Sequence, residues 1–173
     1  MSGAAAIVRL PRRGRFIFRG RADALKAAGV AYGVALPRQA CRAAFAGSRA
    51  ALWLGPDEWL LLLPEGEAEN CAAALTRALA GLPHSLVDVG HRQVGLEIAG
   101  PPAATVLNAG CPLDLDGAVF PVGMCTRTVL GKAEIVLWRV AEQCFRIEVA
   151  QSFAAYVLGL LNEALREFAT GGG

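Results

Sequence analysis

The sequence predicts an α+β fold made of two similar halves, in which mostly antiparallel sheets are backed by helices. One observation behind this prediction is that strand-like runs follow one another directly, which disfavours a nucleotide-binding α/β fold with alternating strands and helices. The other is an internal duplication with a period of roughly 80 residues, typical of two pseudo-symmetric halves rather than of a solenoid.

The duplication is visible in two pairs of passages. Residues 15–37, RFIFRGRADALKAAGVAYGVALP, are similar to residues 94–116, VGLEIAGPPAATVLNAGCPLDLD, because each fits a strand, a glycine, a short helix and a loop. Residues 41–54, CRAAFAGSRAALWL, are similar to residues 125–138, CTRTVLGKAEIVLW. These matches place Gly20 on Gly100, Cys41 on Cys125, and Gly47 on Gly131.

We therefore expect a single domain, residues 1–173, composed of two halves at about residues 7–83 and 84–169. Each half has the predicted order strand, helix, three strands, helix. The stretch HSLVDV, residues 84–89, is an additional strand that links the halves.

Local patterns support the elements of the second half. Strands are indicated by period-two alternation of Val94, Leu96 and Ile98, and of Phe145, Ile147 and Val149. Pro101 and Pro102 suit the first turn of a helix, and Gly110 is expected at a left-handed cap at its end.

The last helix has the clearest signal. Its apolar residues recur at three- and four-residue spacing and form a wide stripe. They are Phe153, Tyr156, Val157, Leu160, Leu161, Ala164, Leu165 and Phe168. Ser152 is the expected N-cap. Residues 67–80 form a weaker version of the same pattern.

The composition favours a globular, cytoplasmic protein. Hydrophobic residues make up 54% and charged residues 18% of the 173 residues. The N-terminal stretch does not resemble a secretory signal, and no apolar run reaches the length that a membrane span needs. The five cysteines form no Cys-x-x-Cys pair, so we interpret them as core residues rather than as disulfides or a zinc site.

Charge is concentrated at the N-terminus, where residues 1–49 hold ten Lys and Arg residues and one acid, Asp23. Phe16 and Phe18 could stack on nucleic-acid bases, but their spacing fits the core face of a strand better. The neighbouring arginines, including Arg12, Arg13 and Arg15, are then solvated or docked on a protein partner.

Three stretches are candidates for sites of chemistry. DLDG, residues 114–117, lacks the third acid and the distal glutamate of a calcium loop, which favours a turn. Asp88, His91 and Arg92 form the most functional-looking polar stretch, yet no nucleophile accompanies them, so turn or interface roles are favoured. Gly-Pro-Asp-Glu, residues 55–58, is typical of a hairpin turn between two β-prone runs, which favours a turn over a catalytic carboxylate pair.

Several motifs together resemble the gamma subunits of bacterial heterotetrameric sarcosine oxidases. The motifs are ALWLGPDEWLLL, HSLVDVGHRQVGLEI, AGCPLDLD, FPVGMCTRTVLGKAEIVLWR and FRIEVAQSFAAYVLGLL, spread over roughly residues 8–168. The resemblance implies a fold similar to the folate-binding domain of the glycine-cleavage aminomethyltransferase.

The resemblance also implies a role in assembly. In such complexes sarcosine is oxidatively demethylated to glycine, and the one-carbon unit can pass to tetrahydrofolate. An alpha subunit carries NAD and folate sites, a beta subunit carries FAD, FMN lies between them, and a delta subunit binds zinc. The chain itself is expected to carry no catalytic, cofactor-binding or metal-binding residue, no nucleic-acid or membrane partner, and to pack against the alpha subunit.

Two alternatives remain open at this point. The chain could belong to a related N-methyl amino-acid dehydrogenase complex, or it could be a free-standing folate-binding protein of one-carbon metabolism. For the partner interface, the sequence favours the basic segment with Arg12, Arg13 and Arg15, and the strip with His91 and Arg92.

Overall fold

The computed structural model describes residues 4–170 and divides into two compact units. One unit is Arg12–His91, and the other joins the residues up to Pro11 to those from Arg92 onward. Each unit has a five-stranded antiparallel sheet and two α-helices. This arrangement confirms the predicted fold class.

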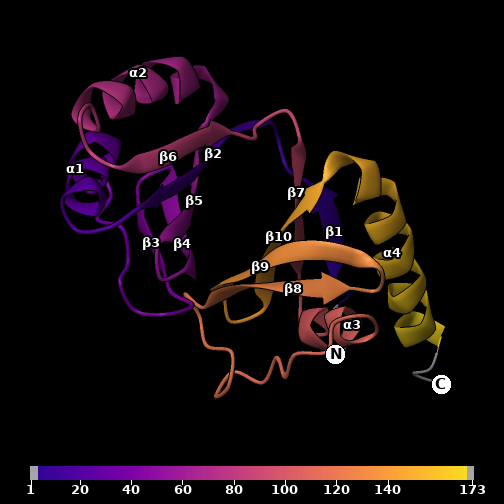
Figure 1. Cartoon of the computed structure of the whole chain (residues 1–173). Helices are drawn as coiled ribbons and strands as arrows, with labels where there is room; N and C mark the ends of the chain where they lie inside the picture. The colour runs from indigo at the N-terminus through magenta and orange to yellow at the C-terminus, as the bar shows by residue number, and fades with distance from the viewer. Residues whose placement is uncertain (1–3, 171–173) are drawn as a thin grey trace. The chain divides into compact units, whose positions relative to one another are not determined.

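In the first unit the sheet has the order β3-β4-β5-β2-β6, and both helices lie on one face of it (Figure 1). Its elements are β2 (Arg13–Gly20), α1 (Asp23–Tyr32), β3 (Ala43–Ala46), β4 (Arg49–Gly55), β5 (Glu58–Pro64), α2 (Ala68–Ala78) and β6 (His84–Asp88). Phe16 and Phe18 are buried against Leu75 of α2 and the rest of this core, as their alternation predicts.

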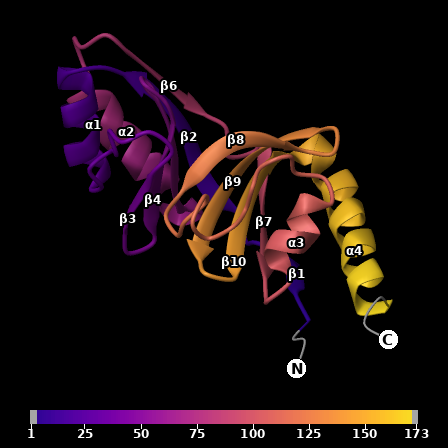
Figure 2. The ribbon, with the colours of Figure 1, turned by 90° about the horizontal axis from the view of Figure 1, so that it is seen from below.

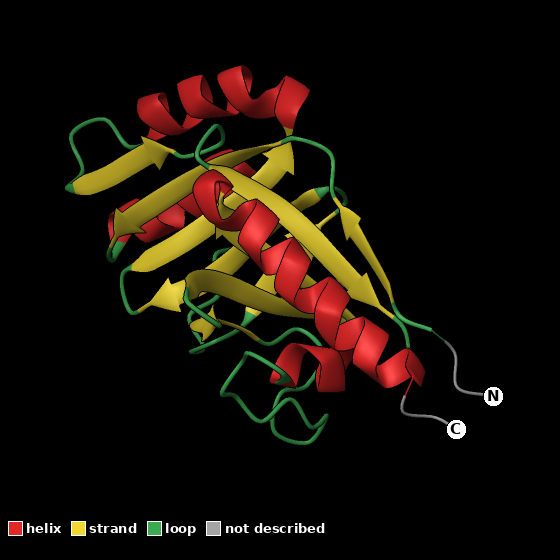
Figure 3. Cartoon of the chain, turned by 90° about the vertical axis from the view of Figure 1, so that its right-hand side faces the viewer, coloured by secondary structure: helices red, strands yellow, loops and turns green. Residues whose placement is uncertain are grey.

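The second unit repeats this plan, with the sheet order β1-β7-β10-β9-β8. Its elements are β1 (Ala6–Arg9), β7 (Gln93–Ala99), α3 (Ala103–Asn108), β8 (Cys125–Leu130), β9 (Ala133–Ala141), β10 (Cys144–Ala150) and α4 (Ala154–Thr170). Figure 2 shows α3 and α4 beside β1 and β7, and Figure 3 shows α4 running along the sheet.

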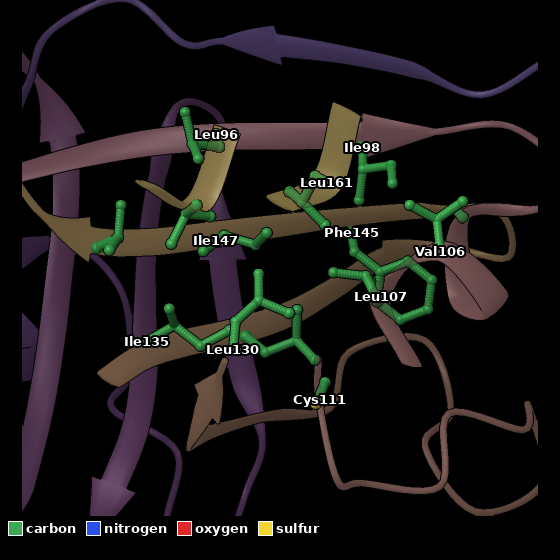
Figure 4. Packing of buried hydrophobic residues seen from close by; sticks show 14 of the residues in the cluster. Leu96, Ile98, Val106, Leu107, Cys111, Leu130, Ile135, Phe145, Ile147 and Leu161 are labelled. Atoms are coloured by element: carbon green, nitrogen blue, oxygen red, sulfur yellow. The ribbon is translucent and has the colours of Figure 1, made fainter. Parts of the chain in front are cut away.

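A single apolar core joins the sheet and helices of the second unit. Leu96 and Ile98 of β7 and Phe145 of β10 meet Val106 of α3 and Leu161 of α4 (Figure 4). All five side chains are fully buried. Burying a large apolar side chain stabilises a fold by roughly 1.5–3 kcal/mol, so this layer fixes the helices on the sheet.

The two units differ from the expected halves because the first strand of each half pairs with the other half's sheet. Strand β1 precedes β2 in the chain but pairs with β7, from Ala6 opposite Ala99 to Arg9 opposite Leu96. Strand β6 precedes β7 but pairs with β2. Residues 84–91 therefore lie with the first unit and residues up to Pro11 with the second. The sequence pattern does not predict the four-residue strand β1.

The matched glycines of the duplication have matching backbone roles. Gly47 has φ 56° and Gly131 has φ 60°, and each lies in the tight turn between the first two strands of its three-stranded run. These positions require the left-handed conformation, which glycine adopts without the steric cost that a Cβ brings. The duplication seen in the sequence is thus real at this turn.

Two expected caps are wrong. Gly110 does not have a positive φ, and α3 ends instead at Ala109 in right-handed conformation. A Cβ on Gly110 would lie 3.0 Å from the Gly131 nitrogen, so close approach explains this glycine. Ser152 lies inside a 3₁₀ turn, Gln151–Phe153, that leads into α4, and it is therefore not an N-cap. A corresponding 3₁₀ turn, Glu65–Glu67, leads into α2.

Candidate functional site

The paired acids Asp57 and Glu58 lie at the tip of the β4–β5 hairpin, as the sequence predicts. Trp53 and Trp59 are register partners on the two strands that flank this tip. The Arg19 guanidinium lies 2.9 Å from a Glu58 carboxylate oxygen, and the Arg21 guanidinium lies 3.4 Å from an Asp57 oxygen. Both acids are therefore engaged in ion pairs with arginines at the end of β2.

Much of the charge on the basic N-terminal segment is neutralised within its own unit. Besides the two pairs at the hairpin tip, Arg12 lies 3.7 Å from Glu65, and Arg49 lies 2.7 Å from Glu67. The acids that balance these arginines are thus gathered in residues 57–67. The N-terminal segment is therefore less of a free basic arm than its composition indicates.

The expected position of the arginines on the surface is wrong for Arg15. Its residue exposure is 1%, and its Nη1 donates a hydrogen bond to the Arg13 carbonyl at 3.2 Å. Arg13 is half-buried and donates to the Ser48 carbonyl, whereas Arg12 is exposed. Period-two alternation places Phe16 correctly in the helix-facing core but does not reveal that Arg15, which points to the other face of the strand, is also buried.

The polar strip 88–92 forms a turn. Asp88 accepts a hydrogen bond from the Gly90 backbone N–H at 2.8 Å, which is an Asx-type contact that satisfies the carboxylate locally. His91 and Arg92 are both exposed. The Val89 N–H donates to the Arg15 carbonyl at 2.9 Å, so this turn runs beside the start of β2. The structure therefore brings together the two strips that the sequence offers as a partner interface.

The aspartates at 114 and 116 also form local turns. Asp114 accepts from the Asp116 N–H at 2.9 Å, and Asp116 accepts from the Ala118 N–H at 2.8 Å. This confirms the turn interpretation of that stretch. Within residues 4–170, no three His, Cys, Asp or Glu side chains gather as a metal site would require. No helix in the same range is long and apolar enough to span a membrane.

None of the five cysteines forms a disulfide, and all five lie in the core or at its edge. Cys71, Cys111 and Cys125 are buried, and Cys41 and Cys144 are half-buried. Burial raises the pKa of the Cys71 thiol, and burial together with the Glu97 carboxylate raises that of Cys144. Raised thiol pKa values disfavour the nucleophilic thiolate, which supports a packing role for both residues.

Sequence reasoning missed a buried arginine in β9. Arg139 is 6% exposed and donates hydrogen bonds to the carbonyls of Leu115 at 3.1 Å, Phe120 at 2.8 Å and Glu142. It therefore holds the long connection between α3 and β8. The signal in the sequence is a lone arginine inside the apolar strand EIVLWRV.

The hollows on the described surface include three of about 300–500 Å³. One of about 500 Å³ on the second unit's sheet is lined by Gln93, Glu148 and neighbouring strand residues. One of about 470 Å³ lies at the hairpin tip beside Arg21 and His84. The third, of about 310 Å³, lies between α1 and the segment that follows it.

Comparison with known proteins decides the family. The model of the "Sarcosine oxidase, gamma subunit family" matches residues 19–167. The chain belongs to this family. Among its relatives, the sarcosine oxidase subunit gamma of Corynebacterium sp. (strain P-1) is 38% identical over 143 residues, covering 81% of this chain and 68% of the relative. The corresponding subunit of Arthrobacter sp. is 37% identical over 141 residues, with the same two coverages.

Solved structures agree with the family and the fold. A chain of the heterotetrameric sarcosine oxidase from Corynebacterium sp. U-96 matches with a TM-score of 0.89 and 32% identity, covering 95% of this gamma-family chain and 85% of that one. The glycine cleavage aminomethyltransferase T of Bartonella henselae matches with a TM-score of 0.70 and 17% identity, covering 92% and 46%. The second likeness shows the fold alone and agrees with the predicted folate-binding-domain-like architecture.

Proposed function

We propose that this gamma subunit is a non-catalytic assembly subunit of a heterotetrameric sarcosine oxidase, in which it packs against a larger alpha subunit. The complex as a whole would oxidatively demethylate sarcosine to glycine and deliver the one-carbon unit to tetrahydrofolate. One observation carries this proposal: nearly the whole chain matches a chain of a heterotetrameric sarcosine oxidase, with 95% coverage.

The contacts of the acidic side chains support a structural role. Asp57 and Glu58 are bound by arginines, and Asp88 is bound by the turn that it forms. A general acid or base must reach a substrate proton, and its pKa must lie near the working pH. Side chains that fix a hairpin tip and a turn are better suited to holding a shape that a partner recognises.

The cofactors of the complex are proposed to lie on the partner subunits. Under this proposal NAD and folate bind to the alpha subunit, FAD to the beta subunit, FMN between the two, and zinc to the delta subunit. The gamma chain then contributes a binding surface for the other subunits and no catalytic groups. Its cellular location is proposed to be the cytoplasm, together with its partners.

Co-expression tests the proposal directly. The full chain is expressed with and without the neighbouring large subunits, and each preparation is separated by size-exclusion chromatography. We expect the chain to elute with a flavin-containing complex that oxidises sarcosine, and the isolated chain to be colourless and inactive. A monomer that oxidises sarcosine by itself would overturn the assembly role.

The same preparations separate the alternatives. An assembled complex that oxidises N-methylglutamate in preference to sarcosine would place the chain in a related dehydrogenase. Tetrahydrofolate binding to the isolated chain, measured by calorimetry in the micromolar range, would favour a free-standing folate-binding protein. The similarity in fold to an aminomethyltransferase is the reason to test the isolated chain for folate binding.

A further inference from the structure

A groove with an apolar floor and two cations lies between α1 and residues 35–38. We propose that this groove binds an acidic segment of the large partner subunit, with an apolar side chain of that segment in the groove and carboxylates against Lys26 and Arg38. This inference rests on the proposed function and adds a location and a chemistry to it.

The wall formed by α1 exposes an apolar residue next to a cation. Lys26 and Val30 are four residues apart in the helix, which places them on one face, one turn from each other. Val30 is 78% exposed, and with Leu25 and Leu36 it lines the groove. An apolar side chain from a partner would remove this surface from water, which is favourable in proportion to the area covered.

The opposite wall is held in place by the core. The Trp59 indole N–H donates to the Pro37 carbonyl at 2.8 Å, and Trp59 itself is 1% exposed. Arg38 follows Pro37 directly. At the base of the groove a Cβ on Gly29 would lie only 3.4 Å from the Val34 carbonyl oxygen, so the segment rests against the helix. A preformed groove of this kind binds without the cost of ordering a loop.

The charge of the groove is unbalanced. No acidic side chain lines it, and in the described part of the chain neither Lys26 nor Arg38 forms an ion pair. By contrast, Arg12, Arg19, Arg21 and Arg49 are paired with acids of the same unit. Among the described residues, the unpaired positive charge of the basic N-terminal segment therefore includes Lys26 and Arg38 in this groove. Because potentials at protein interfaces are complementary, carboxylates are favoured opposite these two cations.

A protein segment fits these features better than a nucleic acid does. Phosphates would engage Lys26 and Arg38 but would leave exposed Val30 and half-buried Leu25 in contact with water. A segment with an apolar anchor between Asp or Glu residues uses both. Such an interface has the usual pattern of an apolar centre with a polar rim.

Charge reversal in the full complex tests the proposal. The double variant K26E/R38E is co-expressed with the large subunits and compared with the wild-type chain and with R77E/K132E. The control pair makes the same change in net charge at two exposed positions outside the groove. Circular dichroism melting verifies that all variants fold.

We expect K26E/R38E to bind the large subunit at least about tenfold more weakly than the wild-type chain, and R77E/K132E to bind normally. Wild-type binding should also weaken as salt is raised. A milder variant, Val30→Ser, should reduce binding without changing charge. Unchanged binding of both groove variants would overturn the inference while leaving the assembly role intact. Failure of the wild-type chain to bind any large subunit would overturn the proposed function itself.

Discussion

The Arg139 guanidinium lies over the Phe145 ring, with 4.9 Å between its central carbon and the ring centre. The ring's π-electrons attract the cation, while the Leu115 and Phe120 carbonyls of the α3–β8 connection accept hydrogen bonds from it. The first unit holds its corresponding α1–β3 connection differently, through the Trp59 indole and the Pro37 carbonyl. Equivalent loops are thus fixed by different side chains in the two units.

Replacement of Arg139 should loosen the α3–β8 connection. Arg139→Met leaves the buried carbonyls without donors, and each buried unpaired polar group costs roughly 1–3 kcal/mol. We therefore expect unfolding in urea to become easier by about 3 kcal/mol. Hydrogen exchange should rise mainly in residues 111–124.

A matched pair of variants separates this role from a general effect of charge. Arg139→Lys keeps the charge but lacks the planar fork that reaches several carbonyls, so it should lose about half as much stability as Arg139→Met. Trp59→Phe should cost about 1 kcal/mol and affect residues 33–38 instead. Equal stability of the Lys variant and the wild type would contradict the proposed hydrogen-bonding role.

Tyr32 should make stability depend on pH in the alkaline range. Burial raises the pKa of its hydroxyl, which lies 2.6 Å from the Leu62 carbonyl and 2.9 Å from the Ala50 carbonyl and can donate to either. In the unfolded chain this phenol ionises near its ordinary pKa of 10.0. Between that pH and the raised native pKa, the native state binds more protons. The contribution of Tyr32 to the free energy of unfolding is therefore fully present below about pH 10. Above it, up to the native pKa, this contribution falls by about 1.4 kcal/mol for each pH unit.

The Tyr32→Phe variant isolates this contribution, because buried cysteines also ionise at high pH. At pH 7 the variant should be less stable by about 1–2 kcal/mol, since the hydroxyl that donates to either the Ala50 or the Leu62 carbonyl is removed. The difference from the wild type should shrink as pH is raised from about 10 to about 11 in urea titrations. A difference that stays constant over this range would show that Tyr32 ionises equally easily in both states.

Two glycines should respond in opposite directions to alanine. At Gly131 the φ of 60° disfavours a side chain, and a Cβ would lie 2.3 Å from the Tyr156 hydroxyl oxygen. Gly131→Ala should therefore destabilise the chain by about 2–3 kcal/mol. Gly159 lies exposed inside α4 with nothing within 4 Å, so Gly159→Ala should stabilise it by up to about 1 kcal/mol. Thermal melting of both variants measures the two shifts, and shifts in the same direction would contradict the different backbone roles assigned to these glycines.

The fold was predictable because the chain repeats its own pattern. Strand alternation at Phe16 and Phe18, the turn glycines Gly47 and Gly131, and the stripe of α4 each fixed an element locally. The exchange of β1 and β6 was not predictable in this way. Pairing with a distant strand leaves no periodic signal in four or five residues, so only the tertiary structure reveals it.

The partner interface stays a prediction, and the sequence shows the excess of positive charge without its distribution over the surface. Excess positive charge before residue 50 indicated a partner, yet the pairing of Arg19, Arg21 and Arg49 with later acids depends on strand register. Burial of Arg15 likewise depends on the tertiary structure and has no periodic signal in the sequence. The groove beside Lys26 and Arg38 could not be found from spacing, because a loop wall held by Trp59 creates it.

Substitution of the hairpin acids should change stability in proportion to burial and should not change catalysis by the assembled enzyme. The Glu58 side chain is 9% exposed in its pair with Arg19, whereas Asp57 is 38% exposed in its pair with Arg21. Exposed ion pairs contribute little because water and salt screen them, so Asp57→Asn should change the free energy of unfolding by less than about 0.5 kcal/mol. Glu58→Gln should cost about 1–2 kcal/mol, because the hydrogen bond from Arg19 then goes to a neutral amide oxygen instead of a buried carboxylate. Sarcosine oxidation by complexes purified with either variant should keep its wild-type kcat and pH profile. A large loss of kcat in a fully assembled complex would instead indicate that these carboxylates are catalytic.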